Sequence, residues 1–308
     1  MRRATIFVLS DVRSGSTLLD QCLGGHPAIV SLGEVHWLAA YLAQDRNVYD
    51  PEHPLVCSCG LPVGDCPFWE NVQRALGRQL DSLHLRQDLK RSRRGSRQIA
   101  ALTHIPQRLI KTQPRLYRCS AVRSLFDGRR LARDCTALYD AVSATTGRPF
   151  SVDSSKSPYR FRDVYGFDPG RTVAIALSRD YRAVVHSRIR HGQSMHMAAL
   201  GWRRRMRQIM VLTKDLPADR VMRLTYETFC EDPRGALNRI CSFLGIEFAE
   251  SMLQRATENV HHIGGSPSKF DPGRIQIALD RSHVGQFSAT ELRTIQQLVG
   301  GAAAEWGY

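Results

Sequence analysis

The sequence lacks a long apolar run. None of its hydrophobic stretches approaches the roughly 20 residues that a membrane-spanning helix needs. The first residues, MRRATIFVLSDV, begin with a methionine and two arginines, but their apolar part is too short for a secretory signal peptide. These two absences predict a cytoplasmic protein without an integral membrane segment.

Acidic residues are scarce relative to basic ones. The 308 residues include 29 Asp and Glu against 43 Lys and Arg, a net charge of +14. Such a surplus favours an anionic partner: nucleic acid, an acidic membrane, or a ligand that carries phosphate or sulfate. The basic run LRQDLKRSRRGSRQ at 85–98 has no interleaved aromatic residue. Because nucleic-acid binding needs more than charge, this run is interpreted as a solvated, mobile face, and no nucleic-acid partner is predicted.

The two-residue cysteine spacing that is typical of zinc sites is also missing. Of eight cysteines, three lie together, Cys57, Cys59 and Cys66 in HPLVCSCGLPVGDCPFW. With His53 they could form a zinc site, but their spacing favours buried thiols or one local disulfide. The later pair His261 and His262 is interpreted as structural, so no metal ligand is predicted.

The chain has no internal repeat and no flexible linker, which predicts one domain over residues 1–308. Strand-like apolar runs alternate with amphipathic helical runs, and this alternation predicts an α/β fold with a parallel sheet and helices on both faces. Residues 40–147 are expected to form a mostly helical insertion. The expected strands are Thr5–Leu9, Ala28–Leu32, Phe150–Val152, Thr172–Leu177 and Val221–Leu224.

A polar turn follows the first expected strand and leads into a helical pattern. It contains Arg13, Ser14, Gly15, Ser16 and Thr17 in VRSGSTLL. A strand, a tight turn and a helix N-terminus direct backbone N–H groups toward one point, which suits a phosphate. The G-x-x-x-x-G-K-[ST] spacing of a Walker A loop is absent, so magnesium-dependent nucleotide chemistry loses its main sequence support. An ordinary serine-rich turn is the alternative.

A second polar turn follows the fourth expected strand, in TVAIALSRDYRAVVHSRIRHG at 172–192. Arg179 stands at the strand end, and Ser187 stands about two helical turns into the next helix. An arginine and a hydroxyl suit a second phosphate group. The alternative is a helix capped by Asp180 among surface arginines.

These motifs carry a family resemblance. VRSGSTLL resembles the 5′-phosphosulfate loop of the sulfotransferase superfamily, LSRDYRAVVHSRI resembles its 3′-phosphate motif, and VMRLTYETFCEDPRGALNRICSFLGI at 221–246 is similar to a later family segment. The resemblance, to a bacterial member near the protein-tyrosine and heparan-type branch, implies a P-loop-like parallel sheet flanked by helices, with helical insertions. It implies 3′-phosphoadenosine 5′-phosphosulfate as donor, adenosine 3′,5′-bisphosphate as product, and no metal.

The resemblance also implies residue roles. Glu34 in HPAIVSLGEVHWL matches the proposed base of that branch, and His36 is the second candidate because cytosolic members use a histidine. Lys156 in FSVDSSKSPYR matches the lysine that stabilises the leaving group. Glu34 as a purely structural partner of Arg13 or another cation, and Lys156 as an exposed loop residue, are the alternatives.

The remaining positions complete the implied donor site. Tyr226 matches a tyrosine near the adenine, although a core aromatic is equally consistent, and Gly265 and Lys269 match a late loop over the nucleotide. The expected reaction is sulfuryl transfer to an acceptor hydroxyl on a carbohydrate, a lipid or other small molecule, or a peptidyl tyrosine. The basic insertion at 40–147 suits an acidic or glycosylated acceptor. A P-loop-type small-molecule kinase and a basic nucleic-acid-binding protein remain open alternatives.

Overall fold

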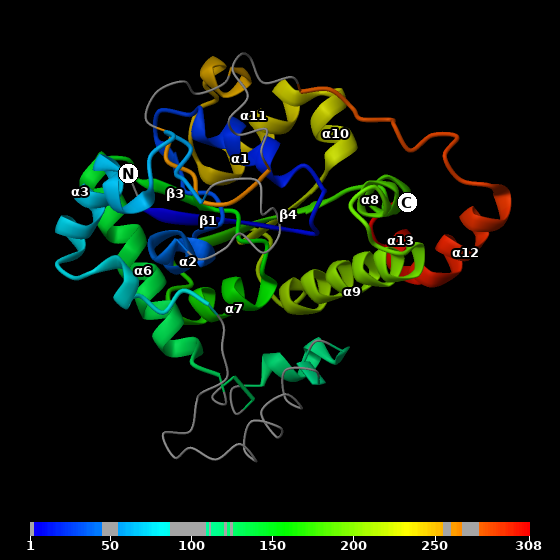
Figure 1. The fold of residues 1–308 in the computed structure, drawn as a ribbon, viewed down its shortest axis with the longest axis horizontal. Helices are drawn as coiled ribbons and strands as arrows, with labels where there is room; N and C mark the ends of the chain where they lie inside the picture. The colour runs from blue at the N-terminus through cyan, green and yellow to red at the C-terminus, as the bar shows by residue number, and fades with distance from the viewer. Residues whose placement is uncertain are drawn as a thin grey trace.

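The computed structural model centres on a sheet of five parallel strands in the order β2-β3-β1-β4-β5 (Figure 1). It describes residues 3–44, 55–86, 109–110, 112–119, 122–123, 126–254, 260–266 and 277–308. All five strands expected from the sequence are present. They are β1 Ala4–Ser10, β2 Ile29–Ser31, β3 Phe150–Asp153, β4 Thr172–Ser178 and β5 Val221–Thr225.

Helices cover both faces of the sheet, as the alternation predicted. Successive side chains of β1 point to opposite faces, so Ile6 and Val8 belong to the core under one helical layer while Phe7 and Leu9 belong to the other. Figure 1 shows α1, α10 and α11 on one side and α6, α7 and α9 on the other. Their bounds are α1 Ser16–Gly24, α6 Gly128–Thr146, α7 Pro158–Phe167, α9 Met195–Thr213, α10 Tyr226–Glu231 and α11 Pro233–Leu244.

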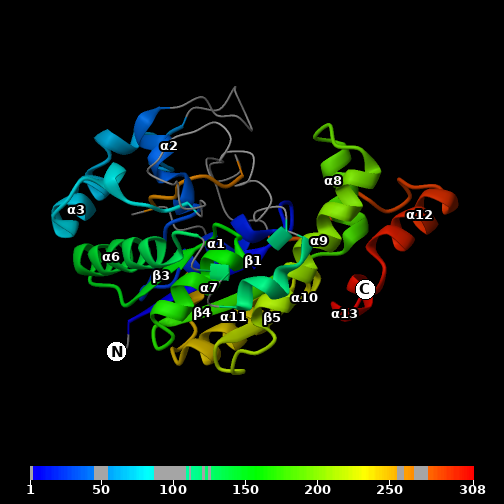
Figure 2. The same ribbon diagram turned by 90° about the horizontal axis from the view of Figure 1, so that it is seen from below.

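The remaining elements lie toward the two ends of the molecule. Figures 1 and 2 place α2 and α3 at one end and α12 and α13 at the other. The bounds of these four helices and of α8 are α2 Leu38–Ala43, α3 Pro67–Leu76, α8 Tyr181–Ile189, α12 Ala289–Val299 and α13 Gly301–Glu305. The short 3₁₀ helices are η1 Val35–Trp37, η2 Val63–Asp65, η3 Leu80–Ser82, η4 Pro114–Arg118 and η5 Glu250–Leu253.

The described parts of the predicted insertion at 40–147 are largely helical. Its longest helix, α6, buries Leu131, Cys135, Leu138 and Val142 against the sheet. Most of the basic run at 85–98 lies outside the described residues. Among the residues that are described, no helix is both long enough and apolar enough to cross a membrane.

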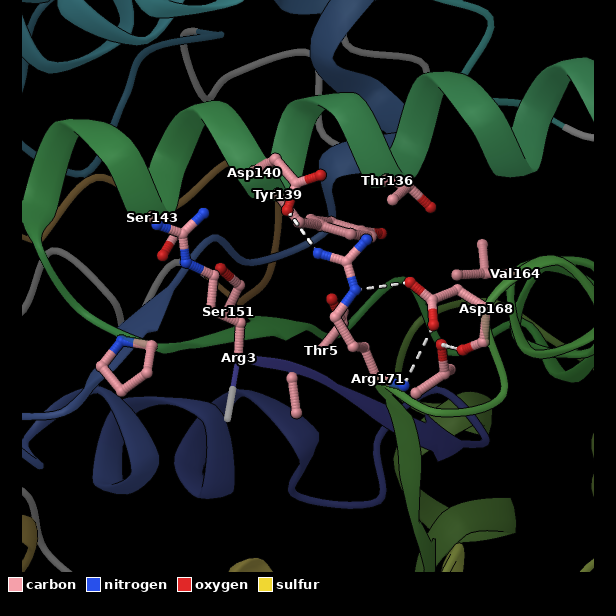
Figure 3. A pocket seen from close by; sticks show the side chains of 13 residues that line it. Arg3, Thr5, Thr136, Tyr139, Asp140, Ser143, Ser151, Val164, Asp168 and Arg171 are labelled. Atoms are coloured by element: carbon pink, nitrogen blue, oxygen red, sulfur yellow. Dashed lines mark hydrogen bonds and ion pairs between the residues drawn. The ribbon is translucent and has the colours of Figure 1, made fainter. Parts of the chain in front are cut away.

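The two edges of the sheet differ in chemistry. In a parallel sheet all carboxyl ends of the strands lie along one edge, where ligands usually bind. A pocket at the opposite edge is lined by Arg3, Thr5 and Thr172 near the strand starts (Figure 3). There the guanidinium of Arg171 donates to Asp140 and Asp168, at 2.7 and 2.6 Å. This pocket is on the far side of the sheet from the residues that the sequence singled out.

Candidate active site

The turn between β1 and α1 has the backbone conformation of a tight anion-binding loop. Arg13 and Gly15 are both left-handed, with φ of 67° and 81°. A side chain at Gly15 would collide with Tyr226, because a Cβ there would lie 2.4 Å from the ring atom Cδ2. No side chain caps the N-terminus of α1. Glycine is therefore required at this position, and the first N–H groups of α1 are left for another acceptor.

The second polar turn meets the first. The Nε of Arg13 donates to the Ser187 hydroxyl at 3.2 Å, and Arg179 donates from Nη1 to the carbonyl of Arg13 at 3.1 Å. The His191 ring also contacts the Arg13 guanidinium, and its Nδ1–H donates to the Ser187 carbonyl at 2.7 Å. Two motifs more than 160 residues apart in the chain thus form one polar cluster.

This polar cluster has an excess of positive charge and unused hydrogen-bonding atoms. Burial and the neighbouring Arg179 and Arg190 lower the pKa of Arg13 below its usual value. Within the described part of the chain, the Ser14 hydroxyl and the Nε of Arg179 are buried without a hydrogen-bond partner. Buried polar atoms are normally paired, so these atoms mark a position where a ligand oxygen would be stabilised.

Tyr226 packs between the two turns. Its ring lies against Gly15 and beneath the guanidinium of Arg179, which is 4.4 Å from the ring centroid. Its hydroxyl donates to the carbonyl of Ala278 at 3.1 Å. The ring is 5% exposed, so the core aromatic foreseen as an alternative and a place beside the nucleotide site are both compatible with its position.

Asp280 joins this cluster without any signal in the sequence pattern. Its Oδ2 accepts from Nη2 of Arg179 at 2.8 Å. Burial disfavours the carboxylate, but the bond from Arg179 and the hydrogen bonds from Ser282 together outweigh burial and hold the pKa of Asp280 well below its usual range. Asp280 lies 101 residues from Arg179 in the chain, in a segment without regular secondary structure, so no local periodicity could have identified it.

Glu34 and Lys156 form a direct ion pair at the ends of β2 and β3. Their side chains are 15% and 12% exposed, so Lys156 is not the solvent-exposed loop residue considered as an alternative. Burial raises the pKa of Glu34, but the ammonium of Lys156, the nearby His36 and a hydrogen bond from Trp37 together outweigh burial and leave that pKa below its usual value. Glu34 is therefore ionised at neutral pH, and its cation is Lys156 rather than Arg13.

Backbone strain is concentrated at these candidate site residues. Lys156 has φ of 63°, as Arg13 has φ of 67°. A left-handed non-glycine residue costs about 1–2 kcal/mol, and such residues gather at functional sites. Two of the three described non-glycine residues with positive φ are thus candidates that the sequence had already named.

His36 lies beside this pair and is half-buried. Burial lowers its pKa to about 4, so its imidazole is neutral at pH 7. Within the described residues its Nδ1 has no hydrogen-bond partner, and its backbone N–H donates to the Ser155 hydroxyl at 3.3 Å. A neutral imidazole with an unpaired nitrogen keeps His36 available as the second candidate base.

Asp20 is a buried acid that the sequence analysis did not identify. Its two carboxylate oxygens accept from Ser31 at 2.5 Å and from Ser154 at 3.1 Å. Burial raises its pKa to about 7, because the two serine hydrogen bonds and the nearby Lys156 only partly offset the effect of burial. It stands on the inner face of α1 and supports the turn that follows β3, two residues before Lys156.

The described segment 260–266, called the late loop below, lies against both parts of the site. Gly264 lies so close to Glu34 that a Cβ there would be 2.9 Å from the Cβ of Glu34, and Gly265 lies against Thr17. The backbone N–H of Ser266 donates to the Thr17 hydroxyl at 3.2 Å. The role of Gly265 over the nucleotide stays a prediction, and Lys269 lies outside the described residues.

Comparison with known proteins supports the resemblance. Residues 171–250 match the profile described as "Sulfotransferase family". The sulfotransferase domain of the Synechococcus PCC 7002 olefin synthase is 23% identical, with a TM-score of 0.56 over 100% of this chain and 96% of that one. The sulfotransferase domain of the curacin biosynthetic pathway is 18% identical, with a TM-score of 0.55 over 100% and 99%. No curated protein sequence matches.

The predicted resemblance to sulfotransferases and the predicted fold class are therefore confirmed. The five-stranded parallel sheet with helices on both faces is the fold of sulfotransferase domains. Placement near the protein-tyrosine and heparan-type branch stays a prediction, as do the individual roles of the site residues.

Proposed function

We propose that this protein is a sulfotransferase that moves a sulfuryl group from 3′-phosphoadenosine 5′-phosphosulfate to an acceptor hydroxyl. The observation that carries the proposal is the meeting of two phosphate-type turns, through Arg13, Ser187 and Arg179, at the edge where Glu34 and Lys156 are paired. A nucleotide with two separate anionic ends needs two such turns. An acid–base pair next to them suits transfer to a hydroxyl.

The residues present fit this donor. The turn from Arg13 to Thr17, with its uncapped helix N-terminus and unpaired Ser14 hydroxyl, would hold the 5′-phosphosulfate. Arg179, whose Nε has no partner within the described residues, would hold the 3′-phosphate together with Ser187. Tyr226 would bound the adenine side. The donor supplies the activated sulfuryl group.

The Glu34–Lys156 pair would serve the transfer in two connected ways. The ionised carboxylate of Glu34 would accept the proton of the acceptor hydroxyl. Once Glu34 is neutral, the charge of Lys156 is no longer balanced by it and can stabilise the anionic oxygen of the leaving phosphate. Proton uptake by one residue would thus strengthen the electrostatic action of the other, which an isolated lysine could not do.

For the acceptor we propose a class of molecules rather than one compound. The helical insertion at 40–147 and its basic character favour an acidic or glycosylated molecule, among carbohydrates, lipids or other small molecules and peptidyl tyrosine. Sulfuryl transfer carries less charge than phosphoryl transfer, so we expect the reaction to need no magnesium.

Calorimetry with adenosine 3′,5′-bisphosphate, AMP and ATP tests the donor site. We expect the bisphosphate to bind most tightly and its binding to be unchanged when magnesium is omitted. Tighter, magnesium-dependent binding of ATP would support the kinase alternative instead. A preference for nucleic acid that weakens steeply with salt, with no effect of the bisphosphate, would support the nucleic-acid alternative.

Glu34→Gln tests the base. The amide keeps the shape of the side chain, so bisphosphate affinity should stay near the wild-type value while the transfer rate falls about 10²–10⁴-fold. Glu231→Gln changes an exposed carboxylate on α10 and is the matched control. An acceptor panel would be screened with the wild type first. Normal turnover by Glu34→Gln would exclude Glu34 as the base and favour His36.

A further inference from the structure

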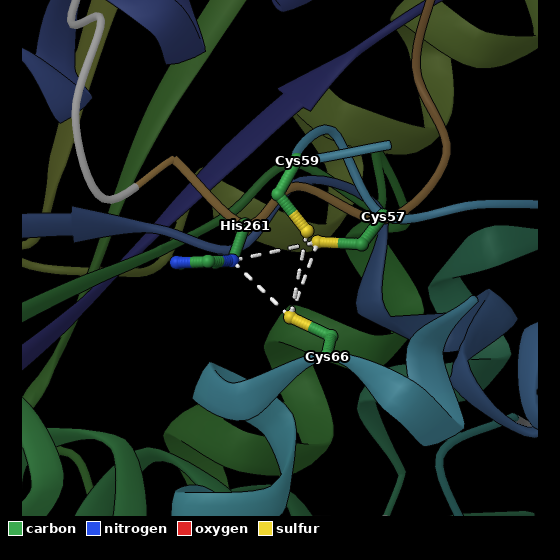
Figure 4. A group of neighbouring side chains, drawn as sticks. All are labelled: Cys57, Cys59, Cys66 and His261. Carbon is green, nitrogen blue, oxygen red and sulfur yellow. Dashed lines mark hydrogen bonds between the residues drawn. The ribbon is translucent and has the colours of Figure 1, made fainter. Parts of the chain in front are cut away.

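Four side chains of the types that ligate metals, from two distant segments of the chain, converge in one group (Figure 4). Cys57, Cys59 and Cys66 lie in the segment that precedes α3, and His261 lies 195 residues after Cys66. Their three sulfurs and one ring nitrogen all lie within 4.8 Å of one another. His261 completes the group, whereas His53, the histidine that the sequence offered, lies outside the described residues.

The distances between these sulfur and nitrogen atoms match those expected between the ligands of one tetrahedral zinc ion. With Zn–S of about 2.3 Å and Zn–N of about 2.0–2.1 Å, tetrahedral geometry places sulfurs about 3.8 Å apart and a sulfur and a nitrogen about 3.6 Å apart. The Cys66 sulfur is 3.8 Å from that of Cys57 and 3.6 Å from that of Cys59. The Nδ1 of His261 is 3.6 Å from the Cys57 sulfur and 3.3 Å from the Cys66 sulfur.

The backbone around these ligands is ordered by its own contacts. Cys57 donates from its N–H to the Leu61 carbonyl at 2.9 Å and accepts from the Gly60 N–H at 2.8 Å, which closes a tight turn. Cys66 is the N-cap residue of α3. The His261 ring stacks on Phe68, with ring centroids 4.5 Å apart and planes 2° apart. The four side chains therefore converge in a preorganised arrangement.

Other chemistries fit these four groups less well. All three cysteines are free, and sulfurs 3.6–3.8 Å apart are well beyond a disulfide bond of about 2.05 Å. A disulfide would also leave one thiol unpaired. An iron–sulfur cluster spreads its protein ligands around two or more irons, whereas here they surround a single point. Three thiolates and one imidazole around one point are a common structural zinc set.

We propose that Cys57, Cys59, Cys66 and His261 bind one zinc ion in a closed, structural site. With four protein ligands, the ion has no open position for substrate. Its binding displaces the protons of the three thiols, which leave to solvent at the side where Cys59 is exposed. The proposal does not depend on the reaction proposed above.

The ion would fasten the late loop beside the active-site pair. The N–H of Ile263 donates to Leu32 at 3.0 Å, and its carbonyl accepts from the N–H of Glu34 at 2.6 Å. Ser58 adds further links: its hydroxyl donates to the Val260 carbonyl at 2.8 Å and accepts from the N–H of His262 at 2.8 Å. Zinc at His261 would therefore hold the backbone on which Glu34 and the neighbouring Gly264 are positioned.

Metal analysis of the intact chain tests the site directly. Protein purified without added chelator should contain about one equivalent of zinc, and Co²⁺ exchanged into it should give the visible absorption of a tetrahedral thiolate site. Metal-free protein with three titratable thiols, a disulfide between any two of the cysteines, or bound iron would each overturn the proposal. These measurements need no acceptor and no activity.

Paired variants locate the ligands. Cys66→Ser and His261→Gln should each lose most of the bound zinc. Cys119→Ser and His196→Gln, which change exposed residues outside the group, should retain it. If the ligand variants do not fold, the metal content and Co²⁺ spectrum of the wild type still decide the question. Retention of a full equivalent by both ligand variants would overturn the assignment.

Hydrogen exchange tests the fastening role. Removal of zinc should speed exchange of the Ile263 and Glu34 amides, whose hydrogen bonds join the late loop to the end of β2. Exchange in β1 and β4, at the centre of the sheet, should not change. Equal protection of the Ile263 and Glu34 amides with and without zinc would overturn this role.

Discussion

The two turns that meet at the candidate active site are built in opposite ways. The turn before α1 leaves polar groups without local partners: Gly15 provides no cap, and the Ser14 hydroxyl is unpaired within the described residues. The turn before α8 instead caps its own helix. Asp180 caps α8 by accepting from the N–H of Arg182, and the N–H of Asp180 donates to Glu227 at 2.9 Å.

The difference shows how each turn can bind an anion. The first offers backbone N–H groups and the positive end of α1, so its specificity depends on backbone conformation and on a glycine. The second has its helix N-terminus occupied by Asp180 and offers only the side chains of Arg179 and Ser187. Backbone changes should therefore damage the first turn, and side-chain changes the second.

The largest effect is expected from Gly15→Ala. The new Cβ would meet the Tyr226 ring in a residue with φ of 81°, so left-handed strain and overpacking together should cost about 2–5 kcal/mol of stability. Gly192→Ala is a matched control, because Gly192 has the same φ and open space around it. It should lose only about 1–2 kcal/mol. Urea unfolding compares the two, and equal losses would show that the contact with Tyr226 is unimportant.

Asp20→Asn should change how stability depends on pH. The pKa of Asp20 is raised to about 7 in the folded protein from an ordinary value of 3.8, so the folded state holds a proton that the unfolded chain releases. Wild-type stability should therefore fall as pH rises from 5 toward 7, by about 1.4 kcal/mol per unit, or about 2–3 kcal/mol in all. The nearby charges of Lys156 and Asp153 are the same in both proteins.

Urea unfolding at pH 5 and pH 8 measures this difference. The variant should gain stability relative to wild type between the two values. A constant difference would mean that Asp20 is ionised throughout the range.

Arg179→Ala should remove the side-chain contribution of the second turn. A charged hydrogen bond is worth about 1.5–3 kcal/mol, so the preference for adenosine 3′,5′-bisphosphate over AMP should fall about 10- to 150-fold. Because this preference is a ratio of two affinities of the same variant, any general effect of the substitution on folding cancels. Arg182→Ala removes a neighbouring guanidinium that pairs with Asp180, and it should leave the preference unchanged. An unaltered ratio in Arg179→Ala would move the second phosphate site elsewhere.

Asp180→Ala should have the smallest effect. Loss of the cap of α8 should lower stability by about 1 kcal/mol, and nucleotide affinity should barely change because the cap itself meets no ligand. Asp180→Asn retains an acceptor for the Arg182 N–H and should be nearly as stable as wild type. Thermal unfolding and calorimetry together distinguish these outcomes. A large loss of affinity in both variants would mean that the second turn also binds through its backbone.

The regular elements were predictable because their signals are local. Each strand is a short apolar run, and β1 to β5 match the expected segments within one residue at each end. The turn from Arg13 to Thr17 was predictable for the same reason, since a glycine between hydroxyl residues after a strand is readable over five positions. Local patterns could not show which distant groups would complete the site.

The sequence by itself therefore determined the strand and helix pattern, the two phosphate-type turns and the surplus of positive charge. Only the tertiary structure decided that Glu34 pairs with Lys156, 122 residues away, that Asp280 meets Arg179, and that His261 stands beside Cys57 and Cys66. The physical reason is that backbone conformation follows neighbouring side chains, whereas ion pairs and metal ligands depend on which strand ends the packed sheet brings together.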